Sequence, residues 1–315
     1  MSEHALLFTL GFSLLAVGAV LLGYGVGQLA RRFGVSPWVI GLVVVPLAAA
    51  APVFAVTVNT ALQQRDNFTL GMILGSTVVN VGFALGFVSL LRPLTGSSKV
   101  VSASISTLLV GVLLFLFVCR DNSVSRIDGV ILLVGFVLAV AYLVWVARGE
   151  TEETKAPFTH WNLQRWPLWI AVPLAIAGLA ALVGGASYVV PEAVELTRMQ
   201  PRGKTHLFGS VAVVLASSLA LIWVAELAAR NRHGDLAIGT VVGASLCNLL
   251  LLPAVAALIA PFGVANVTLM NDIPATALLV YLLLVPSLNG LQVSRSEGAV
   301  LLAASVAYLG WQIWR

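Results

Sequence analysis

The chain has 315 residues, of which 59% are hydrophobic and only 10% are charged, and its mean hydropathy is +1.00. A soluble domain of this length needs far more charge on its surface, so the composition excludes a soluble protein and indicates an integral membrane protein. The net charge of +4 is ordinary for such a protein, and no basic patch interleaved with aromatic residues indicates nucleic-acid binding.

Ten apolar stretches are candidates to cross the hydrocarbon layer, which takes about 20 helical residues. In chain order they cover residues 4–28, 36–62, 68–91, 99–119, 126–147, 166–190, 204–229, 235–260, 270–288 and 295–313. The longest polar stretch, "ARGETEETKAPFTHWNLQR", separates the fifth from the sixth and has the composition of a linker. We therefore predict an all-α membrane protein with a five-helix unit at 1–148, a polar linker at 149–165 and a second five-helix unit at 166–315.

One phrase occurs in both halves: "LGMILGSTVVNVG" begins at Leu70, and "IGTVVGASLCNLL" begins at Ile238. Identical residues pair without a gap at one constant difference in residue number, which we call the repeat offset: Gly41 and Gly209, Ala48 and Ala216, Gly71 and Gly239, Gly75 and Gly243, Asn80 and Asn248, Pro93 and Pro261. Because each half has an odd number of spans, the second copy enters the membrane from the opposite side. This pattern predicts two inverted five-helix repeats, an arrangement of secondary transporters that bind substrate at the midplane.

Both phrases resemble the alpha-repeats of the calcium/cation antiporter superfamily, the sodium/calcium exchangers. The repeats of that family read like GTSLPE in one span and GNxxGSNxxN in the next. The resemblance covers essentially the whole chain and assigns "AAAAPV" (48–53) and "ASSLAL" (216–221) to the first motif. It implies the ten-helix exchanger fold and alternating access at a midplane site.

The chain departs from the family motif at the residues that bind the cation. The glutamate positions of the two family motifs are here Val53 and Leu221, and several family asparagines are replaced by Met72, Thr77, Thr240 and Ser245. The candidate ligands that remain are Ser76, Thr77, Asn80, Ser217, Ser218, Thr240, Ser245 and Asn248, with carbonyls freed near Pro52. A divalent cation needs several oxygen ligands and an anionic group that offsets its desolvation. We therefore expect a transporter of the exchanger type that does not exchange calcium with high affinity.

The sequence leaves other substrates and another role open. A monovalent ion could be held by hydroxyls and carbonyls, and a neutral or amphipathic solute is an alternative. The chain could also be a transport-inactive relative that acts as a membrane scaffold or accessory subunit. A hydrated pocket lined by the candidate ligands favours transport, whereas a pocket filled by Met72, Val53, Leu221 and Trp223 favours the second role. For Asn80 and Asn248, hydrogen bonding between helices is an alternative to ion binding.

Glu226 is the best substitute for the missing carboxylates, because it lies within a predicted span five residues after Leu221. Its simplest interpretation is an interfacial residue that pairs with Arg230 at i,i+4. In the alternative it is a titrating group in a displaced cavity. A five-residue gap in the alignment would place "WVAEL" on the glutamate motif, but this gap breaks the repeat offset.

We expect the remaining polar residues to have structural roles. Asp128, Asp235 and Asp272 begin apparent spans, where a carboxylate complements the helix dipole. Cys119 and Cys247 lie in apolar sequence and are expected to be buried and unpaired. Since there is no Ser-His-Asp, zinc or phosphate-loop arrangement, we expect no enzymatic activity and no cofactor.

The basic residues predict the orientation. Ten of the 17 Lys and Arg lie in loops on the side of the linker, which favours a cytoplasmic linker and both termini outside an inner or plasma membrane. The expected partners are a small ion or solute and membrane lipids, and no protein partner is indicated.

Overall fold

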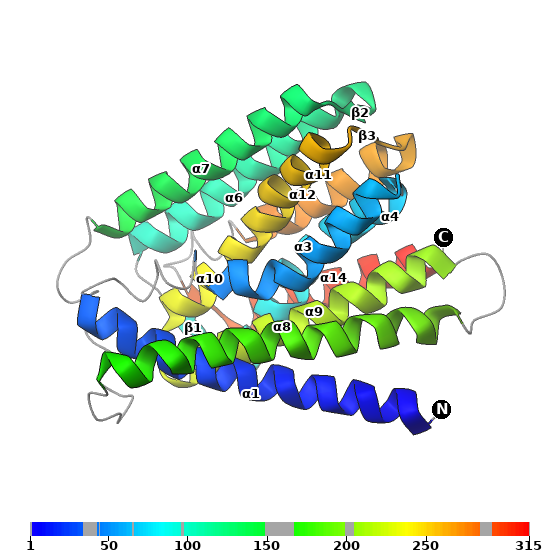
Figure 1. Cartoon of the computed structure of the whole chain (residues 1–315). Helices are drawn as coiled ribbons and strands as arrows, with labels where there is room; N and C mark the ends of the chain where they lie inside the picture. The colour runs from blue at the N-terminus through cyan, green and yellow to red at the C-terminus, as the bar shows by residue number, and fades with distance from the viewer. Residues whose placement is uncertain are drawn as a thin grey trace.

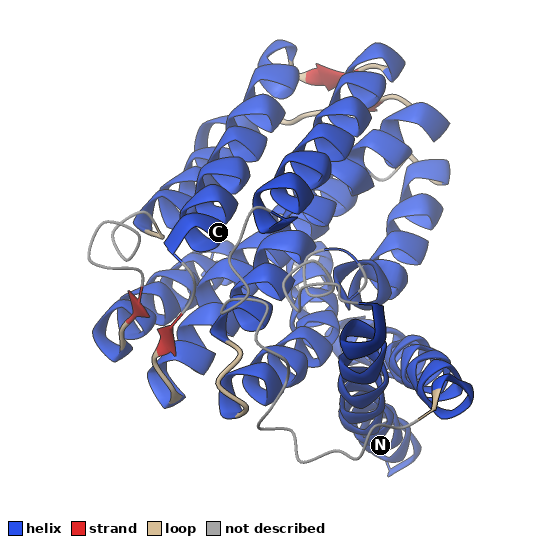
Figure 2. Ribbon diagram, turned by 90° about the vertical axis from the view of Figure 1, so that its left-hand side faces the viewer, coloured by secondary structure: helices blue, strands red, loops and turns tan. Residues whose placement is uncertain are grey.

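The computed structural model describes residues 2–33, 43, 45–64, 66–95, 98–148, 167–198, 205–283 and 292–314, which form a bundle of long helices (Figures 1 and 2). In the first half the helices are α1 (Ser2–Phe33), α3 (Val45–Leu62), α4 (Asp66–Val78), η2 (Val79–Ala84), α5 (Leu85–Leu91), α6 (Ser98–Val118), η3 (Cys119–Asp121) and α7 (Arg126–Arg148). In the second half they are α8 (Leu168–Arg198), α9 (Thr205–Arg230), α10 (Gly234–Leu246), η4 (Cys247–Leu251), α11 (Leu252–Ile259), η5 (Thr268–Asp272), α12 (Ile273–Leu282) and α14 (Arg295–Trp314).

Each of the ten predicted spans overlaps a helix, and six helices of the described chain are long and apolar enough to cross a membrane. The all-α membrane fold is therefore confirmed, whereas the number of ten spans stays a prediction. The sixth helix, α8, continues to Arg198, beyond the predicted end of that span at residue 190. The linker at 149–165 lies outside the described residues, as do most of 36–44 and 284–288.

The repeated phrase has the same local structure in both halves. The π-helical segments η2 and η4 begin at Val79 and Cys247, which are related by the repeat offset, and contain Asn80 and Asn248. In each, an amide donates to the carbonyl five residues earlier: Leu85 to Asn80, and Leu252 to Cys247. π-Helical turns of this kind occur frequently at functional sites because they interrupt the regular helix.

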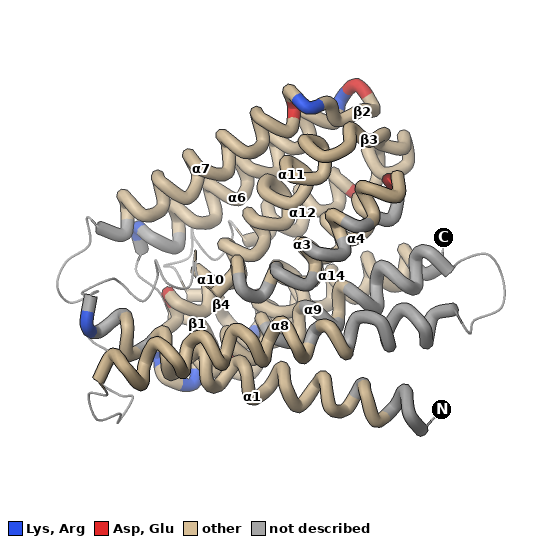
Figure 3. The backbone as a smooth tube through the Cα atoms, in the orientation of Figure 1, with Lys and Arg blue, Asp and Glu red and all other residues tan. Residues whose placement is uncertain are grey.

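Two small antiparallel sheets connect the halves at opposite ends of the bundle (Figures 1 and 3). Strand β1 (Leu94–Thr95) pairs with β4 (Gln292–Val293), and β2 (Ser123–Val124) pairs with β3 (Phe262–Gly263). The repeat offset also relates β1 to β3. The same feature thus appears in both halves but at opposite ends, as expected for inverted repeats.

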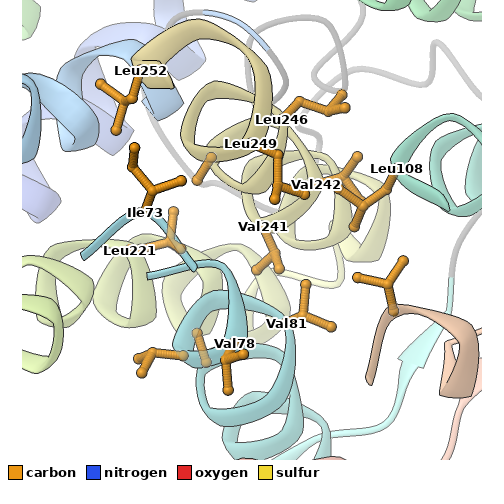
Figure 4. Close-up of a cluster of buried hydrophobic side chains, with 14 of the residues drawn as sticks. Ile73, Val78, Val81, Leu108, Leu221, Val241, Val242, Leu246, Leu249 and Leu252 are labelled. Carbon is orange, nitrogen blue, oxygen red and sulfur yellow. The ribbon is translucent and has the colours of Figure 1, made fainter. Parts of the chain in front are cut away.

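The core is formed where α4 and η2 meet α10 and η4. Side chains from these helices, including Ile73, Val78, Val241 and Leu246, are at most 1% exposed (Figure 4). Charged residues gather near the ends of the helices (Figure 3), whereas α6 and α7 expose apolar side chains such as Leu113 and Trp145, respectively. An apolar outer face with charge at its ends is the surface that a lipid bilayer requires.

Candidate ion site at the centre of the bundle

A cavity of about 20 Å³ lies between α3, α4 with η2, α9, and α10 with η4. It is lined by Ala50, Val53, Ser76, Asn80, Ser218, Leu221, Ala244 and Asn248. These residues form four pairs with one member from each half, and the repeat offset relates the two members of every pair. The cavity is therefore built from equivalent positions of the two repeats.

The described residues that line this cavity carry only neutral side-chain oxygens. Ser218 Oγ donates to Asn80 Oδ1 at 3.2 Å, a hydrogen bond that joins the two halves. Ser76 is 2% exposed, and its Oγ has no hydrogen-bond partner among the described residues. Asn248 is 3% exposed and is the residue that the repeat offset relates to Asn80. The cavity can thus offer hydroxyl and amide oxygens to a small cation.

The other lining residues are apolar. Val53 and Leu221 are 4% and 2% exposed and occupy the motif positions where the resemblance implies glutamates. Trp223 is 39% exposed and does not line the cavity, and neither does the buried Met72. Of the four side chains that could fill the site, only Val53 and Leu221 reach it. Among the described residues, no group of three or more His, Cys, Asp or Glu could hold a metal ion.

Three predicted ligands lie away from the cavity. The hydroxyls of Thr77, Thr240 and Ser245 donate to carbonyls one turn earlier on their own helices, at 3.0, 2.6 and 2.8 Å. Neighbouring helical residues differ by about 100° in direction, so Thr77 points away from the face that Ser76 and Asn80 share. Helix α3 is continuous through Pro52, whose side chain lies outside the described set, as does that of Ser217.

Glu226 also lies outside the cavity lining. Its Oε1 is 3.4 Å from Arg92 Nε and 3.9 Å from Arg230 Nε, so the predicted i,i+4 pair is accompanied by a closer partner from the other half. Its Oε2 is buried and has no hydrogen-bond partner in the described part of the chain. The side chain is 19% exposed, whereas Arg92 and Arg230 are 49% and 62% exposed, which is typical of an ion pair at the membrane edge.

Comparison with known proteins identifies the family. The model of the sodium/calcium exchanger protein family matches residues 3–145 and 170–314.

The chain belongs to the sodium/calcium exchanger family.

Its relatives in that family have similar lengths. It is 28% identical to the putative antiporter CaxA of Alkalimonas amylolytica over 95% of both chains, and 27% identical to the inner membrane protein YrbG of Escherichia coli K12 over 97% of both. It is 24% identical to the sodium/calcium exchanger MaX1 of Methanosarcina acetivorans over 96% of this chain and 98% of that one. The fold matches the sodium-calcium exchanger NCX_Mj soaked with 100 mM Na⁺ and 10 mM Sr²⁺, with a TM-score of 0.82 at 22% identity over 98% and 97% of the two chains. The protein is therefore a multi-pass membrane protein with the exchanger fold.

One predicted structural role in this exchanger-family chain is wrong. Asp272 does not start a helix, because residues 266 and 267 are already helical, and it is buried at 4% exposure. Its Oδ1 accepts a hydrogen bond of 2.7 Å from Gln312 Nε2, which also donates to Tyr308 Oη. Asp128 does cap its helix, through Ser125, and Asp235 lies in the first turn of α10. Cys119 and Cys247 are buried and free, as expected.

The sequence missed two lining residues, Ala50 and Ala244. Neither carries a functional group, so no chemical signal marks them. The repeat offset could have identified them, because they are the partners of Ser218 and Ser76.

Proposed function

We propose that this chain is a transporter of the exchanger type that moves a small monovalent cation by alternating access through the central cavity. The observation that carries the proposal is a cavity built from equivalent positions of both halves and lined by neutral oxygens of Ser76, Asn80, Ser218 and Asn248. In this proposal units 1–148 and 166–315 each contribute half of the site.

The size of the cavity favours a single ion. A volume of about 20 Å³ is enough for roughly one water molecule, which needs about 10–15 Å³ on the same measure. A bare monatomic cation has a similar size. A lipid-like molecule or a solute of many atoms does not fit in this conformation.

The lack of charge favours a monovalent ion over calcium. The desolvation free energy of an ion grows with the square of its charge, so a divalent ion loses about four times as much as a monovalent ion of equal radius. Calcium sites offset this cost with carboxylates, but Val53 and Leu221 supply none. Rings of neutral carbonyl oxygens are sufficient for monovalent cations in other proteins.

The proposed orientation has the linker 149–165 in the cytoplasm of an inner or plasma membrane. The charge distribution of the loops supports it. In Figure 1 the end of α7 and the start of α8 lie at one end of the bundle, and both termini lie at the other. This arrangement is compatible with an even number of spans.

Flux measurements in proteoliposomes test the proposal. We expect exchange that depends on Na⁺ or K⁺, with or without counter-movement of protons, and no saturable calcium binding. Asn80→Leu should reduce this flux at least about tenfold, because it removes an oxygen ligand and leaves Ser218 without its acceptor. Glu226→Gln, outside the cavity, should retain the flux.

Three results would change this interpretation. Saturable calcium binding that is lost in Ser76→Ala or Ser218→Ala would contradict a monovalent site. Loss of flux in Glu226→Gln would restore Glu226 as a titrating group. A folded protein that shows neither flux nor binding for any ion would favour the scaffold or accessory role, and copurifying lipids and proteins would then be identified.

A further inference from the structure

A line of buried hydroxyls extends from the cavity toward the end of the bundle opposite the linker. On α3, Thr57 and Thr60 follow Val53 at spacings of four and seven residues, so they continue its face of the helix. On α4, Thr69 precedes Ser76 by seven residues and lies on the face of that residue. Thr57, Thr60 and Thr69 are 1%, 7% and 1% exposed.

Among these three threonines, the hydroxyl oxygens of Thr57 and Thr60 have lone pairs that accept no hydrogen bond from the described residues. Thr69 Oγ1 donates to Thr60 Oγ1 at 2.8 Å, and Thr60 Oγ1 donates to the Thr57 carbonyl at 3.1 Å. Thr57 Oγ1 is buried and has no hydrogen-bond partner among the described residues. A hydroxyl offers two acceptor lone pairs, so Thr57 retains both and Thr60 retains one. Burying an unsatisfied hydroxyl is unfavourable, and this points to a partner that is present during part of the transport cycle.

The equivalent line in the second half is apolar. The repeat offset relates the three threonines to Ala225, Ala228 and Ala237, which are at most 1% exposed. Near the linker end of the same helices, Glu226 pairs with Arg92. The two routes from the cavity to the surface are therefore chemically different, although the cavity itself is built from equivalent positions.

We propose that Thr57 and Thr60 form a second binding station for the transported monovalent cation, between the cavity and the membrane face opposite the linker. The proposal rests on the function proposed above. The cation would be held by the lone pairs of the two hydroxyls and by the water that it retains, and Thr69 would fix the orientation of Thr60. A divalent ion is disfavoured here for the same reason as in the cavity, because the station has no carboxylate.

This station serves only one membrane face. On the route toward the linker the three equivalent positions are the buried Ala225, Ala228 and Ala237, which carry no hydroxyl oxygen. Removal of the station should therefore slow exchange of the cation with one side only. A residue that merely stabilises the fold would change exchange with both sides equally.

Thr57→Val tests the station because valine has nearly the same shape and lacks the hydroxyl. Thr276→Val is the matched control: Thr276 is also 1% exposed, but it lies on α12 and its hydroxyl donates to the Asp272 carbonyl at 2.8 Å. Right-side-out and inverted membrane vesicles give access to each face, with Na⁺ and K⁺ as probes. We expect Thr57→Val to lower the initial rate about tenfold in one vesicle orientation and to leave the other within about twofold, while Thr276→Val changes neither.

The outcomes separate this proposal from the function on which it rests. If the native protein exchanges cations and Thr57→Val changes neither face, or both equally, the station is wrong and the central site stands. If the native protein exchanges no monovalent cation, both proposals fail. Thermal unfolding of the two valine variants verifies that the comparison uses folded protein.

Discussion

The double variant Val53→Glu/Leu221→Glu is expected to gain saturable calcium binding, at least about a hundredfold tighter than any binding by the native chain. The two side chains come from equivalent positions and line the same cavity. Two carboxylates would supply the charge that offsets the desolvation of the ion, and each can bind through one or two oxygens. With Ser76, Asn80, Ser218 and Asn248 already present, the site would reach the six to eight oxygen ligands that calcium takes.

Calorimetric titration of the purified variant with calcium measures this gain. Val53→Gln/Leu221→Gln is the matched control, since glutamine has the length of glutamate but no charge. We expect each single glutamate variant to bind more weakly than the pair, because one carboxylate offsets only half of the ionic charge. A folded glutamate pair that binds no more calcium than the glutamine pair would show that these two positions do not control divalent binding.

The repeat architecture could be predicted from the sequence because identical residues recur at the repeat offset. The offset between the two copies of the phrase also relates η2 to η4, β1 to β3 and the four pairs that line the cavity. Helix ends were less predictable, because a polar residue in an apolar stretch can begin a helix or lie buried within it. Asp272 illustrates this: only the three-dimensional structure brings Gln312 to its carboxylate.

The sequence predicted which helices line the cavity, but not which of their side chains face it. Glycine and asparagine spacing located the right helices, yet sequence alone does not state which face of a helix is turned toward the cavity. Ser76 and Thr77 are neighbours with the same functional group, and only Ser76 lines the cavity. The contact between Arg92 and Glu226 joins residues 134 positions apart and has no local signal. Such contacts depend on how the two halves pack, which short motifs do not encode.

Close packing of α1 against α8 gives the second large prediction, namely that Gly178→Ala destabilises the fold. The two helices lie along each other in Figure 1, and a Cβ atom at Gly178 would overlap the backbone of Leu22. At Gly25 and Gly185 an added Cβ would come within 2.5 Å of the Ala175 nitrogen and 2.7 Å of the Gly11 oxygen. Backbone atoms cannot rotate away as a side chain can, so the two helices must separate to admit the methyl group.

Gly184→Ala is the matched control on the same helix, because a Cβ at Gly184 meets nothing within 4 Å. Overpacking of this kind costs about 1–3 kcal/mol, and in a chain of this length each 1 kcal/mol lowers Tm by about 1.5 °C. We therefore expect Gly178→Ala to unfold about 2–5 °C below the native protein in detergent, and Gly184→Ala to unfold within about 1 °C of it. Equal melting of the two variants would mean that α1 and α8 are not held together by direct backbone contact. A lower Tm for Gly178→Ala alone would show that the glycines are required for the helices to pack, since the added methyl group is the same in both variants.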